Sequence, residues 1–209
     1  MDGTLTDSMW VWDKVDDDFS AKHNVTLTPD DKQNIHAATF SDAVQYLIDR
    51  CASVDSLDKV ISEMTEMATY EYVHNVPLVK GADKYLAFLR SKGIRIYLLT
   101  GCTPEMAYAA LKARGVFDYF DGFYFADKPH LVKTKPTVFS ETLKAIKKIP
   151  SDCVLFEDMP FAIKTAKELG IYTVTVVATK RDGMSDPAAK IADLAVTDYT
   201  DERIYALFD

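Results

Sequence analysis

Asp2, Thr100, Lys133, Glu157 and Asp158 have side chains suited to chemistry on a phosphate group, although they are scattered along the chain. Carboxylates, a lysine and hydroxyl or N–H donors are the protein groups that position a phosphoryl group and offset its charge, usually together with Mg²⁺. Mg²⁺ prefers a few carboxylates, with waters and phosphate oxygens completing its octahedron. These residues can act together only if the fold brings them to one place.

The pattern from about residue 76 onward predicts elements that would do so. Apolar, strand-like runs alternate with helical segments, which is typical of parallel βαβ units whose sheet is covered on both faces. Ligands bind beyond the carboxyl ends of such strands, which is where Thr100-Gly101 and Glu157-Asp158 fall. The runs cover 94–100, 122–125, 153–158 and 172–177, and the helical segments cover 82–91, 104–113, 137–148 and 161–169.

The preceding segment differs, because from about Met9 to Asn75 the apolar spacing is helical. It predicts a long helix over 55–74 and a shorter one beginning near Ser41. We therefore predict an α/β protein with a Rossmann-like, doubly wound parallel sheet formed by 1–11 and 76–209. An all-helical domain, 12–75, is inserted into it.

The charge balance bears on the partners. The chain has 32 acidic against 24 basic residues, a formal charge of −8, so it repels nucleic-acid backbones. A small anionic substrate would need a metal or a lysine to be held. No apolar run suits a membrane span, no leader pattern is visible, and the three cysteines are widely spaced. We expect a cytoplasmic monomer that binds neither nucleic acid nor membrane.

Four motifs, in order, resemble those of the haloacid dehalogenase superfamily, and the resemblance covers essentially the whole chain. The first family motif is Asp-x-Asp-Gly-Thr-Leu, and the third contains Lys-Pro-x-Pro-x-x-Phe, with Lys135 standing where its third residue would be. The helical segment lies where the family's C1 cap domain belongs. The matching residues are Met1-Asp2-Gly3-Thr4-Leu5, Leu98-Leu99-Thr100, Lys133 with Pro136 and Phe139, and Phe156-Glu157-Asp158 followed by Ala162, Ile163 and Ala166.

The resemblance implies a Mg²⁺-dependent phosphatase that acts on a small phosphorylated metabolite through an aspartyl-phosphate. Asp2 would be the general acid and base and would lend its backbone carbonyl to Mg²⁺. Asp158 would be a metal ligand and Glu157 an outer-sphere helper at the metal. Asp2 is also the residue that dehalogenases of this superfamily lack, which favours phosphoryl transfer.

The same resemblance assigns the phosphate-binding groups. Thr100, together with the amides of Gly101 and Cys102, would hold the phosphate. Lys133 would neutralise charge on the phosphate and the nucleophile. The neighbouring Lys135 is a second candidate for the motif lysine, and Lys133 is preferred because Pro136 and Phe139 then fall into register.

The chain departs from the family at the nucleophile. The nucleophilic aspartate belongs two residues before Asp2, so we expect it, with an apolar strand, upstream of Met1. The chain as given would then be inactive by the usual mechanism. Two alternatives remain open, namely a phosphomutase of the β-phosphoglucomutase type and a catalytically inactive protein that binds phosphate or metal.

Overall fold

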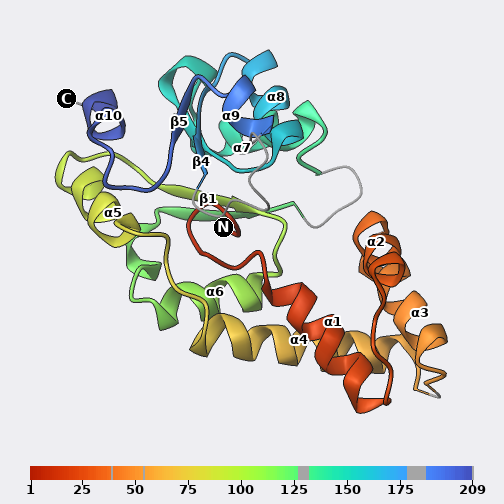
Figure 1. Ribbon diagram of the computed structural model, residues 1–209. Helices are drawn as coiled ribbons and strands as arrows, with labels where there is room; N and C mark the ends of the chain where they lie inside the picture. The colour runs from red at the N-terminus through yellow and green to blue at the C-terminus, as the bar shows by residue number, and fades with distance from the viewer. Residues whose placement is uncertain (39, 54, 127–131, 178–186, 209) are drawn as a thin grey trace. The chain divides into compact units, whose positions relative to one another are not determined.

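The computed structural model describes residues 1–38, 40–53, 55–126, 132–177 and 187–208. These residues form two compact units (Figure 1). The first is discontinuous and consists of Met1–Ser8 with Pro77–Asp209, and the second is Met9–Val76. The sequence placed the corresponding boundaries at residues 11/12 and 75/76. Across the described residues, no helix combines the length and apolar character that a membrane crossing needs.

The discontinuous unit contains parallel strands, so the predicted α/β class is confirmed. The strands are β1 (Tyr97–Thr100), β2 (Gly122–Phe125), β3 (Val154–Phe156), β4 (Tyr172–Val176) and β5 (Leu194–Val196). Their pairings divide into two groups, β1-β2 and β3-β4-β5, and every pair is parallel. Parallel pairing places the carboxyl ends of β1 and β2 side by side, with Thr100 opposite Phe125.

Helices connect these strands, as the alternating pattern predicts. Four of those described, α6, α7, α8 and α9, start with proline, where the missing N–H costs nothing. Thr103 also caps α6, since its side chain accepts a hydrogen bond from the amide of Met106. The helices are α5 (Ala82–Ser91), α6 (Pro104–Ala113), α7 (Pro136–Ile146), α8 (Pro160–Glu168), α9 (Pro187–Ile191) and α10 (Glu202–Tyr205), with 3₁₀ turns at Phe117–Tyr119, Pro150–Asp152 and Ala206–Phe208.

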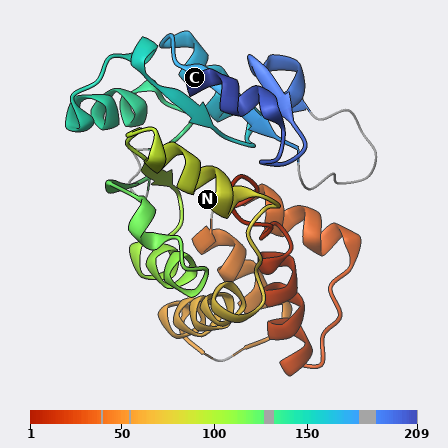
Figure 2. The same ribbon diagram turned by 90° about the vertical axis from the view of Figure 1, so that its left-hand side faces the viewer.

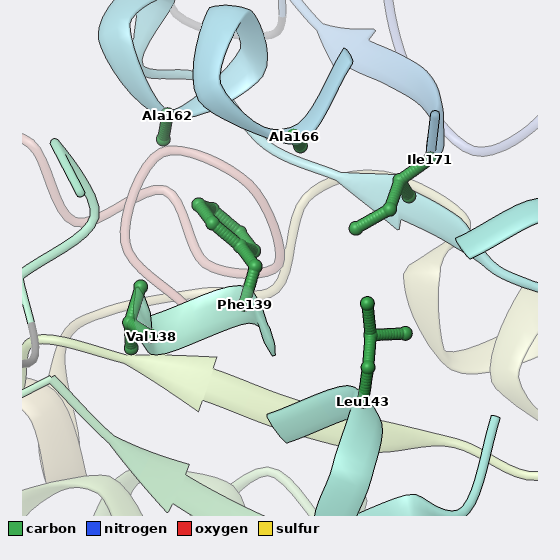
Figure 3. Close-up of a cluster of buried hydrophobic side chains, with 6 residues drawn as sticks. All are labelled: Val138, Phe139, Leu143, Ala162, Ala166 and Ile171. Carbon is green, nitrogen blue, oxygen red and sulfur yellow. The ribbon is translucent and has the colours of Figure 1, made fainter. Parts of the chain in front are cut away.

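A buried apolar cluster between α7 and α8 links the two strand groups. Figure 3 shows its members, which are Val138, Phe139, Leu143, Ala162, Ala166 and Ile171. Leu99 of β1 and Leu155 of β3 both pack against this cluster. Burying a large apolar side chain contributes about 1.5–3 kcal/mol. The cluster therefore holds β1 and β3, whose ends carry the predicted site residues, on a common core.

In the second unit the regular structure of the described residues is entirely helical, as the apolar spacing predicts. Helices α1 and α4 pack together and lie side by side in both views (Figures 1 and 2), and α3 contacts both α2 and α4. Phe19, Val44, Leu47 and Met64 are almost completely buried in this unit. Its helices are α1 (Val11–Lys22), α2 (Pro29–Ala37), α3 (Phe40–Arg50) and α4 (Leu57–His74).

The sequence missed short elements and overextended three strands, β1, β3 and β4. The run from residue 94 becomes strand only at Tyr97, because the amide of Ile96 instead donates to the Asp121 carboxylate at 2.8 Å. Strand β5 has three residues and α10 has four, which is too short for a periodic signal. The α/β prediction nevertheless places Thr100 and Glu157 at strand ends.

Candidate active site

The first-motif residues form a tight loop whose backbone is held by hydrogen bonds within the loop and by one from a neighbouring segment. Gly3 N–H donates to the Thr6 carbonyl oxygen at 3.0 Å, and Leu5 N–H donates to that of Met1 at 2.8 Å. The carbonyl oxygen of Leu5 accepts from the amide of Val79 at 2.9 Å. The side chains of this loop therefore have defined directions.

Asp2 is oriented by hydroxyl groups of its own loop. The hydroxyl of Ser8 donates to Asp2 Oδ1 at 2.6 Å, and Ser8 Oγ lies 3.0 Å from Thr6 Oγ1. Both hydroxyl residues are buried, so the pair holds the carboxylate without competition from bulk water. A carboxylate held in this way can exchange a proton with a group at a fixed position.

Asp158 meets the same loop from the end of β3. The hydroxyl of Thr4 donates to Asp158 Oδ1 at 3.0 Å. Burial, followed by the charge of Glu157, raises the pKa of Asp158 to about 7. Asp2 and Asp158 are thus each held by a hydroxyl of the N-terminal loop, which lies six positions away in sequence for Asp2 and 154 positions away for Asp158.

Glu157 and Lys133 form a buried ion pair next to Asp158. Lys133 Nζ lies 2.6 Å from Glu157 Oε2, and Glu157 Oε1 accepts from the amides of Asp158 and Met159 at 3.1 Å. Burial opposes ionisation of Glu157, but Lys133 and the α-amino group of Met1 outweigh it and lower the pKa. Because both Glu157 oxygens have partners, Glu157 suits an outer-sphere role better than direct coordination.

Thr100 closes β1 and is almost completely buried. Its Oγ1 accepts from the amide of Cys102 at 3.2 Å, so this predicted phosphate donor is engaged by the protein, while Gly101 is exposed. Burial, and then the nearby charge of Asp2, raises the pKa of the Cys102 thiol to about 12. The thiol is therefore protonated at neutral pH and a poor nucleophile.

The predicted residues are brought into one neighbourhood. The charges of Asp2, Lys133, Glu157 and Asp158 all act on the buried α-amino group of Met1, and burial, followed by Lys133, lowers its pKa. The charge of Asp2 also raises the pKa of the Cys102 thiol, and the Cys102 amide donates to Thr100 Oγ1. Groups from the N-terminal loop, β1, the segment before α7 and β3 therefore converge.

The structure distinguishes the two lysines and adds a residue. Lys133 forms an ion pair with Glu157, whereas Lys135 is exposed at the position before α7. Ser8 was not predicted as the partner of Asp2. No local pattern marks a hydroxyl six residues after a carboxylate, since only the turn of the loop brings the two together.

A metal here would rely on few protein ligands. Among the described residues, no group of three or more His, Cys, Asp or Glu side chains is placed to hold a metal ion. Mg²⁺ tolerates this, because it keeps several waters and usually takes one or two carboxylates plus phosphate oxygens. Asp158, a half-buried carboxylate beside Glu157, would be stabilised by a divalent cation. The donor chemistry therefore fits Mg²⁺.

Comparison with known proteins places the chain among hydrolases. The family model for haloacid dehalogenase-like hydrolases matches residues 1–170. The validoxylamine A 7'-phosphate phosphatase of Streptomyces hygroscopicus subsp. limoneus is 26% identical over 205 residues, covering 97% of this chain and 93% of that protein. The phosphorylated carbohydrates phosphatase of Thermotoga maritima is also 26% identical, covering 88% of this chain and 85% of that protein.

Solved structures show the same fold. A Thermotoga maritima protein provisionally named a beta-phosphoglucomutase superposes with a TM-score of 0.82 at 23% identity. The match covers 99% of this chain and 95% of that one. The predicted architecture of a parallel α/β core with a helical domain is therefore confirmed.

Proposed function

The chain belongs to the haloacid dehalogenase-like hydrolases, and we propose that it is a Mg²⁺-dependent phosphatase that hydrolyses a small phosphorylated carbohydrate. The proposal rests on two contacts: Thr4, in the same loop as Asp2, binds Asp158, and Lys133 pairs with the neighbouring Glu157. Two relatives act, by their names, on validoxylamine A 7'-phosphate and on phosphorylated carbohydrates. The site residues suit chemistry on a phosphate group, and the names of the relatives suggest the carbohydrate part of the substrate.

In this proposal Asp2 is the general acid and base. It protonates the leaving oxygen of the substrate and later takes a proton from the attacking water. Ser8 fixes Oδ1 of Asp2, which leaves the carboxyl group a single orientation toward the ester oxygen. A fixed orientation of this kind is what proximity catalysis requires.

Lys133, Thr100 and the amides of Gly101 and Cys102 hold the phosphate in this proposal. Lys133 supplies positive charge and is itself held by Glu157. Thr100 lies at the buried end of β1, so its hydroxyl is presented by a rigid element. Lys135 is exposed and contributes to substrate attraction rather than to contact with the reacting atoms.

The metal site in this proposal uses Asp158, the backbone carbonyl of Asp2 and, in the outer sphere, Glu157. Bound Mg²⁺ would neutralise charge that develops on the phosphoryl oxygens. Thr4 holds one oxygen of Asp158, and Lys133 and two amides hold Glu157. The protein thereby orients the ligands before the cation binds.

The nucleophile in this proposal is an aspartate upstream of Met1, two positions before Asp2, on an apolar strand. Among the described strands, β1 pairs with β2 and β3 pairs with β4, while Leu99 and Leu155 pack on one cluster. A strand added beside β1 or β3 would bring its last residue to the N-terminal loop. The aspartate would attack phosphorus, form an aspartyl-phosphate and release the alcohol, which Asp2 protonates.

The helical segment 12–75, which lies within the compact unit Met9–Val76, is the family's cap domain in this proposal, with residues 1–11 and 76–209 as the catalytic core. We assign substrate selection to the cap. A phosphomutase is the second candidate, because the fold is shared with a protein provisionally named a beta-phosphoglucomutase. A mutase would return the phosphate to the sugar instead of releasing it to water.

The test compares the 209-residue chain with a version extended upstream through its natural coding sequence. We expect p-nitrophenyl phosphate turnover only by the extended protein and only with Mg²⁺, abolished by a chelator. In the extended protein, Asp2→Asn should reduce kcat by about 10²–10⁴-fold, whereas the exposed control Asp152→Asn should not. Sugar and polyol phosphates then define the substrate, and phosphate release distinguishes a phosphatase from a mutase.

Two results would contradict the proposal. An extended protein that remains inactive with all phosphate esters would instead support a catalytically inactive binding protein. Isomerisation of a sugar phosphate without release of inorganic phosphate would favour the mutase.

A further inference from the structure

The C-terminal segment reaches the N-terminal loop through one buried side chain, Tyr199. Its hydroxyl donates to the carbonyl oxygen of Thr4 at 3.2 Å, across 195 positions of sequence. Tyr199 is 4% exposed, and its amide donates to the carbonyl oxygen of Lys80 at 3.0 Å. The backbone and the side chain of this residue are therefore both anchored.

Ring packing fixes the direction of the Tyr199 hydroxyl. The Tyr199 ring stacks on Phe156, with centroids 5.8 Å apart, and also packs on Tyr85 at 5.4 Å. Phe156 is the last residue of β3 and directly precedes Glu157 and Asp158. Tyr199 thus touches both the loop that carries Thr4 and the strand that presents Asp158.

The backbone around Tyr199 is equally constrained. Gly81 has φ +81°, and a Cβ built on it would lie 3.1 Å from the carbonyl carbon of Tyr199 and 2.9 Å from Thr200 Cγ2. Lys80 Nζ also pairs with Asp198 at 3.0 Å. The turn before α5 and the segment around Tyr199 therefore meet backbone to backbone, which leaves Tyr199 little freedom to move.

Thr4 connects Tyr199 to Asp158. Its carbonyl oxygen accepts from Tyr199, and its hydroxyl donates to Asp158 Oδ1 at 3.0 Å. We propose that Tyr199 is a positioning residue that fixes the Thr4–Asp158 hydrogen bond and so orients Asp158 toward the cation. The cation part of this inference rests on the proposed function.

The chain offers a matched control in Tyr85. It is as buried as Tyr199, belongs to the same ring cluster, and its hydroxyl also donates to a backbone carbonyl, that of Ile204, at 3.1 Å. Tyr85→Phe and Tyr199→Phe each keep the ring and delete one such hydrogen bond. The acceptor belongs to the candidate site in one case, Thr4, and to the C-terminal helix in the other, Ile204.

The first measurement is amide hydrogen exchange of the metal-free 209-residue protein. Tyr199→Phe should accelerate exchange of the loop amides, Gly3 to Thr6, and of Asp158 by about fivefold relative to Tyr85→Phe, the change expected for one lost hydrogen bond. Tyr85→Phe should leave these amides at the rates of the unmodified protein. Equal rates in the two variants would overturn the inference.

The second measurement is titration of the same three proteins with Mg²⁺ by calorimetry. Tyr199→Phe should raise the dissociation constant for Mg²⁺ roughly threefold or more. Residues that orient metal ligands typically contribute 10–100-fold to metal affinity, and Tyr199 acts one hydrogen bond further from the metal. Tyr85→Phe should bind like the unmodified protein. A purely structural role would lower the melting temperature of both variants equally and leave Mg²⁺ affinity unchanged, which would also overturn the inference.

Failure of the proposed function gives a different result. If the unmodified protein does not bind Mg²⁺ but exchange at the loop and Asp158 still separates the two variants, the proposed metal site is wrong. The positioning of the Thr4–Asp158 pair by Tyr199 would then be supported on its own.

Discussion

The hydroxyl of Thr4 donates a 3.0 Å hydrogen bond to Oδ1 of Asp158, joining two residues 154 positions apart. The bond joins the N-terminal loop to the end of β3, so the orientation of Asp158 depends on a hydroxyl that is distant in sequence but adjacent in the fold. Asp158 combines this bond with a pKa raised to about 7 by burial and by Glu157.

Thr4→Val should weaken Mg²⁺ binding by about tenfold or more, because the partners that orient metal ligands typically contribute 10–100-fold in affinity. The matched control is Thr165→Val, since Thr165 is equally buried and donates to the backbone carbonyl of Phe161 instead of to an acidic side chain. Calorimetric titration with Mg²⁺ measures both. Equal affinities in the two variants would show that the Thr4 hydroxyl is not needed to orient Asp158.

Lys133→Met should destabilise the protein by about 3–5 kcal/mol, because it leaves Glu157 buried without its cation. The pKa of Glu157 is lowered in the folded state, so the pair's contribution is present above the unfolded pKa and is lost as pH falls. The loss in the variant should therefore be largest near neutral pH and shrink in acid. Denaturant unfolding at several pH values measures it.

Two variants complete this test. Lys133→Met combined with Glu157→Gln should regain much of the lost stability, since the uncompensated charge is gone. Lys135→Met should cost little, because Lys135 is exposed. A Lys133→Met protein as stable as the unmodified one at neutral pH would contradict the prediction.

Asp16→Asn should stabilise the helical unit at neutral and alkaline pH. Burial, and then the charge of Asp13, raises the pKa of Asp16 to about 7, although Lys32 and His36 oppose this. Between the model-peptide value of 3.8 and about 7, the folded state keeps the proton that the unfolded state has lost. Raising the pH through this window therefore lowers the free energy of unfolding, by up to about 1.4 kcal/mol per pH unit.

Tryptophan fluorescence can follow this effect, because the two tryptophans, Trp10 and Trp12, both belong to the helical unit. Asp16→Asn should flatten the decline in stability between about pH 4 and pH 7. An unchanged slope in the variant would assign the decline to another group.

Asp31→Asn should have the opposite pH dependence in the same unit. Asp31 accepts from the backbone and hydroxyl of Thr28, from Tyr46 and from Arg50, and these bonds lower its pKa. Its stabilisation is present above the unfolded pKa and is lost as pH falls, so the variant should melt earlier at neutral pH and match the unmodified protein in acid. Thermal melts followed by tryptophan fluorescence measure this.

Asp30→Asn is the control for Asp31→Asn. Asp30 lies in the same first turn of α2 and is exposed, so it carries the same charge without the capping bonds. A loss equal to that of Asp31→Asn would mean that charge near the helix N-terminus, and not the hydrogen bonds, accounts for the effect.

Gly81→Ala should destabilise the core more than Gly93→Ala. Both glycines have a left-handed backbone conformation, with φ of +81° and +73°. An alanine in this conformation is destabilised by roughly 1–2 kcal/mol. Only at Gly81 would the new Cβ meet Thr200 and the backbone of Tyr199; at Gly93 nothing lies within 4 Å. Denaturant unfolding of both variants isolates the contribution of this close approach, and equal losses would exclude it.

The sequence by itself determined the parallel α/β class and the helical unit. Alternating apolar runs specify buried strands and helices locally, and parallel strands must place Thr100 and Glu157 at the same edge. The spacing of Lys133, Pro136 and Phe139 was also enough to favour Lys133 over Lys135. The catalytic and metal-binding roles of these residues stay predictions.

Only the tertiary structure decided which groups support the candidate site. Ser8 on Asp2, Thr4 on Asp158 and Tyr199 on Thr4 are single hydrogen bonds between residues 6, 154 and 195 positions apart. Short strands such as β5 and the division of the strands into two groups were likewise not predicted. Periodicity reports which face of an element is buried, but a contact between distant hydroxyl and carbonyl groups leaves no period in the sequence and exists only once packing has fixed the chain.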